Sequence, residues 1–340
     1  MSRMIHHGSK SFEAPQLSLR PWPQARGGNY RPALEIGFVN NMPDSAFLAT
    51  ERQFTALVMN AAAGRPVRIH YFSLPSVPRT HETRQRMKGQ YRGLAELEAS
   101  SLDALIVTGT EPKKPKLRDE PYWADFKTLV DWAAENTKST IFSCLAAHGA
   151  VLHMDRIQRR PLAEKCAGVF EAEVLGNDPL MSGFVKPMQV CHSRWNTLDA
   201  GELTRAGYRI LSQSIFAGVD TFIKNVGSEF IFYHGHPEYD DASLLKEYRR
   251  DVTRFMNRER DTYPSMIHGY FDAALERKLL AFRAKAENRD GRVTLADFPD
   301  LAPRKGLAQE LGATADRLYH NWINRLFEQA SVLAVKETRT

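Results

Sequence analysis

The 340-residue chain has a formal net charge of +6, from 46 Lys and Arg against 40 Asp and Glu, and 43% of its residues are hydrophobic. This composition is ordinary for a globular protein that buries a sizeable core. No apolar run approaches the roughly 18 residues that would span a membrane, and the first residues lack the apolar stretch of a secretory signal, so we expect a cytoplasmic protein. The basic residues are dispersed and accompany no nucleic-acid-binding motif, which makes a nucleic-acid partner the less favoured interpretation.

Three cysteines, Cys144, Cys166 and Cys191, are too few and too scattered for a disulfide framework or a zinc-binding spacing. In a reducing compartment all three are expected to be free thiols. The sequence therefore predicts neither a metal site nor a bound cofactor, and the useful question is which thiol is reactive.

The chain opens with an arm, residues 1–32, that is rich in Pro, Gly and Arg and is predicted to be irregular. Short apolar runs typical of buried strands then alternate with segments that have helical apolar spacing. The expected strands are residues 34–39, 67–74, 102–110 and 139–144, and the expected helices between them are 49–62 and 122–136. Strands that alternate with helices favour a doubly wound, mostly parallel α/β sheet.

Residues 163–233 contain short strand-like pieces that suggest β-hairpins added to the same domain. A helix is predicted over 242–256, and we expect the α/β domain to extend over 33–260. The remaining residues, 261–340, are predicted to form a C-terminal extension with one clear helix over 315–335, whose apolar face should pack on the core or on a second subunit. The residues on that face are Leu318, Trp322, Ile323 and Leu326.

Cys144 stands where a predicted strand, STIFS, meets small, helix-tolerant residues, LAAHGAV. In doubly wound sheets the reactive site lies beyond the carboxyl ends of the strands. The unpaired N–H groups and the macrodipole of a helix N-terminus also stabilise a thiolate. Cys144 is therefore a candidate nucleophile. A buried packing thiol is the alternative, because free cysteine is among the most buried residue types.

A nucleophilic cysteine needs a base, and the base needs a group that orients it. The segment FYHGHPEYD offers His236 and Glu238 on either side of Pro237, so that the carboxylate can fix the tautomer of the imidazole. A surface His-Pro turn with a solvated glutamate is the alternative. Cys166 and Cys191 have no comparable strand-to-helix setting and are interpreted as packing thiols.

Several separate motifs follow one another along residues 33–260: NNMPDSAFLATERQF, LDALIVTGT, PYWADFKTLVDW, STIFSCLAAHGAV, EKCAGVFE, CHSRW, HGHPEYD and EYRRDV. In their order and spacing they resemble the homoserine O-succinyltransferase family, and HNWINRLFEQ in the C-terminal helix is a weaker similarity. The resemblance implies a class I glutamine-amidotransferase-like (flavodoxin-like) fold and a role in methionine biosynthesis. It also suggests a homodimer.

The resemblance further implies roles for individual residues. Cys144 is the expected nucleophile, which takes the acyl group from acyl-CoA as a thioester; His236 is the expected general base and Glu238 its orienting carboxylate. A guanidinium suits the carboxylate of a free amino acid, because it can bind both oxygens. The expected substrate-binding residues are Lys165 in AEKCAG, Ser193 in CHSRW and Arg250 in EYRRD.

At Met42-Pro43 the chain departs from the family, which usually continues with two lysines, one of them linked to the oxyanion. Here Asp44 and Ser45 follow. A tetrahedral intermediate still needs hydrogen-bond donors aimed at its oxyanion. Backbone N–H groups after Cys144, together with the N–H or hydroxyl of Ser45, are the donors that the sequence offers.

A second departure follows the TGT motif. The fourth residue after its glycine tunes the acyl donor in the family, glycine going with succinyl transfer and glutamate with acetyl transfer, whereas this chain has Lys113. A cation there can pair with the free carboxylate of a succinyl group, which favours succinyl-CoA. The alternative is that Lys113, like Lys114 and Lys116, faces solvent or the phosphates of the coenzyme.

These interpretations lead to one expected activity. We expect an acyltransferase that moves succinyl from its co-substrate succinyl-CoA to the hydroxyl of L-homoserine. Serine is one methylene shorter, a difference worth only about 1–3 kcal/mol in discrimination, so some activity on serine agrees with the sequence. Transfer from acetyl-CoA is the nearest alternative, and a Cys-His-Glu glutamine amidotransferase or hydrolase is a more distant one.

Overall fold

The computed structural model describes residues 33–288 and 293–337 of the chain. The predicted N-terminal arm, residues 1–32, lies outside the described residues. Within the described ranges, no helix combines the length and the apolar character that crossing a membrane requires.

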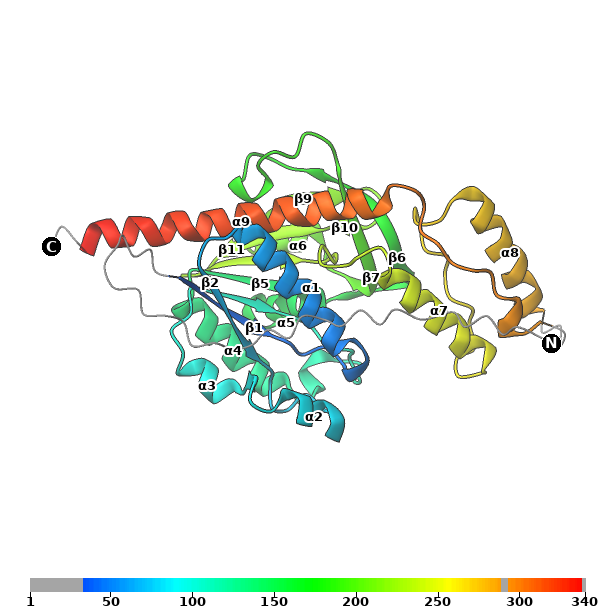
Figure 1. The fold of residues 1–340 in the computed structure, drawn as a ribbon, viewed down its shortest axis with the longest axis horizontal. Coiled ribbons are helices and arrows are strands. Elements are labelled where there is room, and N and C mark those ends of the chain that lie inside the picture. The colour runs from blue at the N-terminus through cyan, green and yellow to red at the C-terminus, as the bar shows by residue number, and fades with distance from the viewer. Residues whose placement is uncertain (1–32, 289–292, 338–340) are drawn as a thin grey trace, which may run out of the picture. The chain divides into compact units, whose positions relative to one another are not determined.

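A mostly parallel sheet forms the centre of the fold (Figure 1). Its strand order is β3-β2-β1-β4-β5-β12-β11-β8; the pairs from β3 to β12 are parallel, and β11 and β8 add antiparallel pairs at one edge. The order β2-β1-β4-β5-β12 is the 2-1-3-4-5 order of a flavodoxin-like sheet, so the predicted fold class is confirmed. The strands are β1 Leu34–Val39, β2 Val67–Phe72, β3 Tyr91–Arg92, β4 Ala104–Val107, β5 Ser139–Ser143, β8 Arg209–Ile210, β11 Thr221–Asn225 and β12 Glu229–Tyr233.

Helices cover both faces of this sheet. On one face lie α4 (Trp123–Asn136) and α5 (Leu145–Asp155), with the short helix α3 (Leu94–Glu98) beside α4. The other face is covered by α1 (Asp44–Ala62) and by the middle of the long helix α9 (Leu307–Glu337). Each face therefore has its own apolar cluster, and the sheet is buried between the two.

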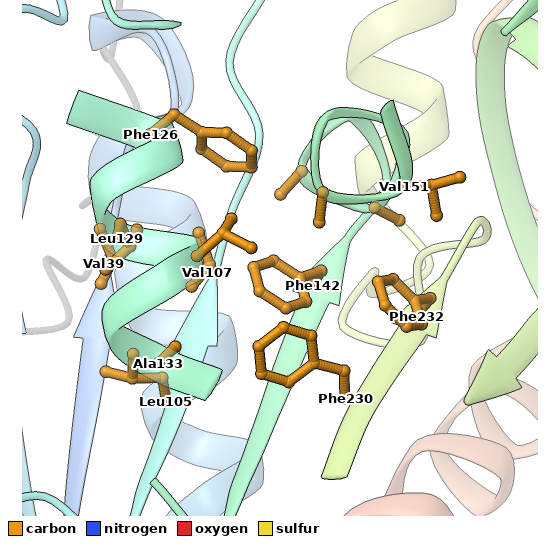
Figure 2. Packing of buried hydrophobic residues seen from close by; sticks show 14 of the residues in the cluster. Val39, Leu105, Val107, Phe126, Leu129, Ala133, Phe142, Val151, Phe230 and Phe232 are labelled. Atoms are coloured by element: carbon orange, nitrogen blue, oxygen red, sulfur yellow. The ribbon is translucent and has the colours of Figure 1, made fainter. Parts of the chain in front are cut away.

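Alternate side chains of each strand point to opposite faces of the sheet, and both faces are covered, which explains the continuous apolar run of β4. In β4, Leu105 and Val107 pack with α4 and α5, whereas Ala104 and Ile106 pack with α1 and α9. Figure 2 shows the first of these clusters, where side chains of α4 and α5 lie over those of the strands. Its labelled members are Val39, Leu105, Val107, Phe126, Leu129, Ala133, Phe142, Val151, Phe230 and Phe232.

A second sheet, with the order β10-β9-β6-β7, stands beside the central one in the chain's middle region. Its strands are β6 Arg160–Val174, β7 Met188–Thr197, β9 Ser212–Ser214 and β10 Gly218–Val219. The antiparallel pairing of β6 with β7 is a hairpin of the kind predicted for this region. The strand β12 differs from that expectation, because it pairs with β11 in an antiparallel manner and also with β5 in parallel inside the central sheet.

The part of the chain after β12 is helical and has its own apolar cluster. Helices α7 (Ser243–Met256), α8 (Ala273–Glu287) and the start of α9 contribute to it. The helix α8 was not predicted from the sequence. The prediction of a C-terminal helix is confirmed, although α9 begins at Leu307, earlier than expected. The remaining short elements are α2 His81–Met87, α6 Ala200–Arg205 and single 3-10 turns at Leu117–Asp119, Pro179–Met181 and Leu295–Asp297.

We predict that Trp322→Ala lowers the free energy of unfolding by roughly 3–5 kcal/mol. Trp322 on α9 is fully buried, and its indole Nε1 donates to Ser139 Oγ at 3.0 Å at the start of β5. The substitution therefore removes a large apolar side chain and leaves a buried hydroxyl with one partner fewer. Urea denaturation measures the loss. The exposed His320→Ala on the same helix is the control, and an equal loss in both variants would contradict the packing of Trp322 against the sheet.

Candidate active site

Cys144 stands at the turn between β5 and α5, the setting predicted for it. Its backbone has φ 50° and ψ −108°, which is strained for a residue other than glycine, and it caps the N-terminus of α5. The Cys144 N–H donates to the carbonyl of Tyr233 at 2.7 Å, directly after the β5–β12 ladder. A sharp strand-to-helix turn of this kind presents a nucleophile beside the free N–H groups of the helix.

His236 and Glu238 follow β12, the parallel neighbour of β5. Because Tyr233 lies opposite Ser143 in the register, the chain that leaves β12 runs beside Cys144. His236 Nδ1 lies 2.8 Å from Glu238 Oε1, and Ser143 Oγ donates to the same oxygen at 3.4 Å. Both side chains are buried. The three residues that were predicted to be catalytic therefore lie together at the carboxyl ends of β5 and β12.

The charge of His236 depends on its neighbours. Burial alone would lower the pKa of the imidazole, but Cys144 and Glu238, which both hydrogen-bond to it, raise that pKa well above its usual value. The imidazolium form is favoured as a result, held between the sulfur and the carboxylate. Tyr239 stacks on the His236 ring with 4.2 Å between the ring centroids, which restricts the ring to this orientation.

Gly235, between the two histidines of HGH, allows this turn to pass close to β7. A Cβ at this position would lie 2.3 Å from Val190 Cγ1 and 2.7 Å from Asp220 Oδ1. The next N–H, that of His236, donates to the Cys191 carbonyl at 2.7 Å. Any larger residue would push the His236 backbone away from β7, so the glycine is needed for the position of the imidazole.

A partly buried carboxylate that the sequence did not single out, Glu247 on α7, contacts two of the predicted substrate-binding residues. Lys165 Nζ donates to Glu247 Oε2 at 3.0 Å, and Ser193 Oγ donates to the same oxygen. Tyr239 donates its hydroxyl to Glu247 Oε1 at 2.7 Å. Burial would raise the pKa of Glu247, but Lys165, Ser193 and Tyr239 outweigh it and hold the pKa below its usual value. The only sequence signal for Glu247 is its place in the EYRRDV motif.

Arg250 joins this group through Asp251. Its Nε and Nη2 lie 3.1 and 3.0 Å from Asp251 Oδ1, and Lys165 Nζ lies 3.5 Å from Asp251 Oδ2. Burial would lower the pKa of Arg250, whereas Asp251, Glu247 and Glu111 raise it above its usual value. Because 46% of its side chain is exposed, the guanidinium keeps an open side toward solvent.

Lys113 lies in the loop after β4 and has an exposed side chain. Its backbone N–H and that of Lys114 both donate to Glu120 Oε1, each at 2.6 Å. Glu120 is buried, so the loop is held by its backbone rather than by its lysine side chains. A role for Lys113 in the choice of acyl donor stays a prediction.

The unusual Asp44 and Ser45 stand in the first turn of α1, beside a buried cation that the sequence did not reveal. Arg79 donates to the carbonyl of Asn40 at 2.8 Å and to that of Met42, and its Nη1 lies 3.5 Å from Asp44 Oδ1. This guanidinium holds the turn before α1 in place. Ser45 is exposed, and its part in binding the oxyanion stays a prediction.

The other two cysteines lie on strands of the second sheet, Cys166 on β6 and Cys191 on β7. Burial raises the pKa of both thiols, most strongly for Cys191. Neither has a helix N-terminus to stabilise a thiolate, which agrees with their interpretation as packing thiols. In the part of the chain that the structure describes, no group of three or more His, Cys, Asp or Glu side chains could hold a metal ion.

Three histidines form a buried polar cluster behind the predicted catalytic residues. His148 on α5 stacks on His234, with 4.7 Å between the ring centroids, and His192 Nε2 lies 3.4 Å from Asp220 Oδ1. Burial lowers the pKa of all three imidazoles, that of His234 to about 3, and the charge of the nearby Arg194 adds to the effect. The three rings are therefore neutral at pH 7.

A family model described as Homoserine O-succinyltransferase matches residues 13–332 of the chain. Relatives of the same name include one from Rhodopseudomonas palustris, which is 49% identical over 290 residues covering 85% of this chain and 87% of that protein. One from Bradyrhizobium japonicum is 42% identical over 95% of this chain and 98% of that protein. One from Methylorubrum extorquens is 39% identical over 97% of this chain and 100% of that protein.

Among solved structures, a glutamine amidotransferase from Thermotoga maritima is similar to the chain with a TM-score of 0.48 and 11% identity, over 88% of this chain and 100% of that one. The strand order of the central sheet, rather than this likeness, identifies the fold.

We predict that the free energy of unfolding falls as the pH drops below about 6.5, by about 1.4 kcal/mol per pH unit for each of His148, His192 and His234. Their pKa values are lowered in the folded state, so below that pH the unfolded chain binds protons that the folded chain does not. Urea denaturation between pH 7.5 and 5 measures the slope. His234→Asn should reduce it by one proton, while the exposed His320→Asn should keep it; an unchanged slope in His234→Asn contradicts the assignment.

Proposed function

The chain belongs to the homoserine O-succinyltransferase family, and on that basis we propose that it transfers succinyl from succinyl-CoA to the hydroxyl of L-homoserine through a thioester on Cys144. The arrangement of Cys144, His236 and Glu238 is the observation that carries this proposal. A cysteine on a strained strand-to-helix turn, an imidazole next to it and a carboxylate on Nδ1 supply a nucleophile, a base and an orienting group.

In the first half-reaction the Cys144 sulfur attacks the thioester carbonyl of succinyl-CoA, and His236 holds the proton of the thiol. The bond from the Cys144 sulfur to the succinyl carbon forms as the bond from that carbon to the coenzyme A sulfur breaks. His236 returns its proton to the departing coenzyme A thiolate. Free backbone N–H groups in the first turn of α5, beginning with Leu145, are the donors that face the oxyanion.

In the second half-reaction His236 accepts the proton of the homoserine hydroxyl. The oxygen attacks the Cys144 thioester, its bond to the succinyl carbon forms, and the bond from that carbon to the sulfur breaks. The proton then passes from His236 back to Cys144, which restores the starting thiol. Glu238 stabilises the imidazolium in both halves, and the covalent intermediate divides one difficult transfer into two easier steps.

The acceptor pocket is formed by the polar group around Glu247. Homoserine carries an ammonium and a carboxylate, so its pocket must offer an anion and a cation. Glu247 supplies the anion, and Arg250, whose guanidinium is partly open to solvent, supplies a fork for the carboxylate. Lys165 Nζ and Ser193 Oγ both donate to Glu247 Oε2 and so hold this carboxylate in place.

We also propose, from the family resemblance, a cytoplasmic homodimer that acts in methionine biosynthesis. Light scattering of the purified protein tests the dimer.

We predict that incubation with succinyl-CoA alone, without homoserine, produces one succinyl adduct on Cys144 and releases coenzyme A. Peptide mass spectrometry locates the adduct. Cys144→Ala should form no adduct and have no transferase activity, whereas Cys191→Ala should still be acylated. An unmodified Cys144 in the active wild-type protein, or activity in Cys144→Ala, contradicts the proposal.

We predict that Arg250→Gln raises the KM for homoserine by about 10- to 100-fold, because one charged hydrogen-bonding group contributes about 1.5–3 kcal/mol. The rate at which succinyl-CoA loads Cys144 should stay at the wild-type value, since the acceptor is absent in that step. The neighbouring exposed Arg249→Gln is the matched control and should change neither quantity. Equal slowing of loading and of transfer in Arg250→Gln would place Arg250 outside the acceptor pocket.

A further inference from the structure

Arg159 is a partly buried cation for which neither the sequence nor the proposed acyl transfer has a use. It lies in the connection from α5, the helix that Cys144 caps, to β6, the strand that carries Lys165. Its Nη2 donates to the carbonyl of Pro115 at 3.4 Å, in the loop after β4. Burial lowers the pKa of Arg159, while Tyr122, Glu120 and Cys144 oppose this through their charges. An electrostatic interaction with Cys144 thus accompanies the contact of Arg159 with the loop after β4.

The adjacent Arg160 shows what an ordinary surface arginine does in this protein. It pairs with Asp199 at 3.0 Å and with Glu202 at 2.7 Å. Within the described ranges, by contrast, no carboxylate lies at ion-pair distance from Arg159, and its hydrogen bond to the neutral carbonyl of Pro115 is long, at 3.4 Å. Keeping a cation partly buried without an anion costs free energy, which a bound anion would recover.

The loop after β4 connects Arg159 to the nucleophile. At the start of the loop, Gly109 packs closely against the first turn of α5. A Cβ added to Gly109 would lie 2.6 Å from Leu145 Cβ and 3.1 Å from the Ala146 nitrogen. At its far end, Pro115 touches Arg159. The loop thus begins beside the N–H groups that face the oxyanion and ends at a guanidinium. The loop therefore connects the surroundings of the nucleophile with those of Arg159.

Tyr122 supplies a second and independent observation. Its side chain is buried, and its hydroxyl has no hydrogen-bond partner in the part of the chain that the structure describes. Tyr122 lines a small pocket against the first turn of α5, together with Gly109, Thr110, Leu117 and Leu145. Burial and the charge of Glu120 raise the pKa of the Tyr122 hydroxyl, and Arg159 partly opposes this, so Tyr122 and Arg159 interact electrostatically. A buried donor without an acceptor, near a cation that has no carboxylate at ion-pair distance in the described ranges, is an arrangement that an anionic ligand would complete.

We propose that Arg159, assisted by the hydroxyl of Tyr122, binds the terminal carboxylate of the succinyl group and so determines the choice of acyl donor. This inference rests on the proposed function. A succinyl thioester has two methylenes and a carboxylate at its end, and a guanidinium fork suits that carboxylate. Lys113, which was predicted for this role, has an exposed side chain, whereas Arg159 is partly buried.

The test compares single-turnover loading of Cys144 from succinyl-CoA and from butyryl-CoA, which has the same four-carbon chain without the terminal carboxylate. Arg159→Gln should lower loading from succinyl-CoA by about 10- to 100-fold and leave loading from butyryl-CoA unchanged, so that the second donor also reports correct folding. Arg159→Lys should restore part of the loss. Tyr122→Phe should lower the succinyl rate by about 3- to 10-fold, again without affecting butyryl.

Two matched variants control the experiment. Arg160→Gln, at the next residue, should keep the wild-type ratio of succinyl to butyryl loading, and Lys113→Gln should change it less than Arg159→Gln does. The inference is overturned if Arg159→Gln slows both donors equally, which would place Arg159 on the coenzyme or the thiol, or if Lys113→Gln alone changes the ratio. Failure of the wild-type protein to load succinyl on Cys144 would instead overturn the proposed function.

Discussion

The parallel pairing of β5 with β12 is the constraint on which the candidate site depends. Ser139 to Ser143 lie in register with Glu229 to Tyr233, and the ladder continues through the hydrogen bond from Cys144 to Tyr233. Two segments that are distant in the sequence therefore end at the same edge of the sheet, one with a cysteine and the other with a histidine. A slip of one residue would send every side chain of β12 to the opposite face, so the two apolar clusters that fix the register also fix the distance between nucleophile and base.

The second constraint is that His236 and Glu247, two charged groups of the candidate site, each lie beside partners that stabilise the charge. His236 is buried but is charged more readily than a free histidine because Cys144 and Glu238 flank it, and Glu247 is ionised more readily than a free glutamate because Lys165 and its hydroxyl neighbours surround it. Tyr239 links the two groups, since it stacks on the His236 ring and donates to Glu247. The proposed nucleophile–base pair and the proposed acceptor pocket thus share one rigid support, so a change in either is expected to affect the other.

Much of the fold could be predicted from the sequence, because four short, mostly apolar segments alternate with helices as they do in an α/β sheet. The helix α8 was missed because its sequence, AALERKLLAFRAKAE, is rich in charge and buries few side chains, so its apolar period is weak. The parallel pairing of β12 was missed for another reason: a short apolar run does not reveal its partner strand.

Cys144, His236 and Glu238 could be predicted as site residues from their local sequence patterns. Glu247 and Arg159 could not be predicted in this way, because their proposed roles depend on contacts with residues that are distant in the sequence.

The central claim is that Cys144 carries the acyl group between the two substrates, and its most direct test is a chase experiment. The protein is loaded with labelled succinyl-CoA, freed of donor by gel filtration and then mixed with homoserine alone. If Cys144 carries the acyl group, the label leaves Cys144 and is recovered in O-succinylhomoserine at a rate no slower than steady-state turnover. Label that remains on the protein, or that leaves only when succinyl-CoA is added again, would contradict it.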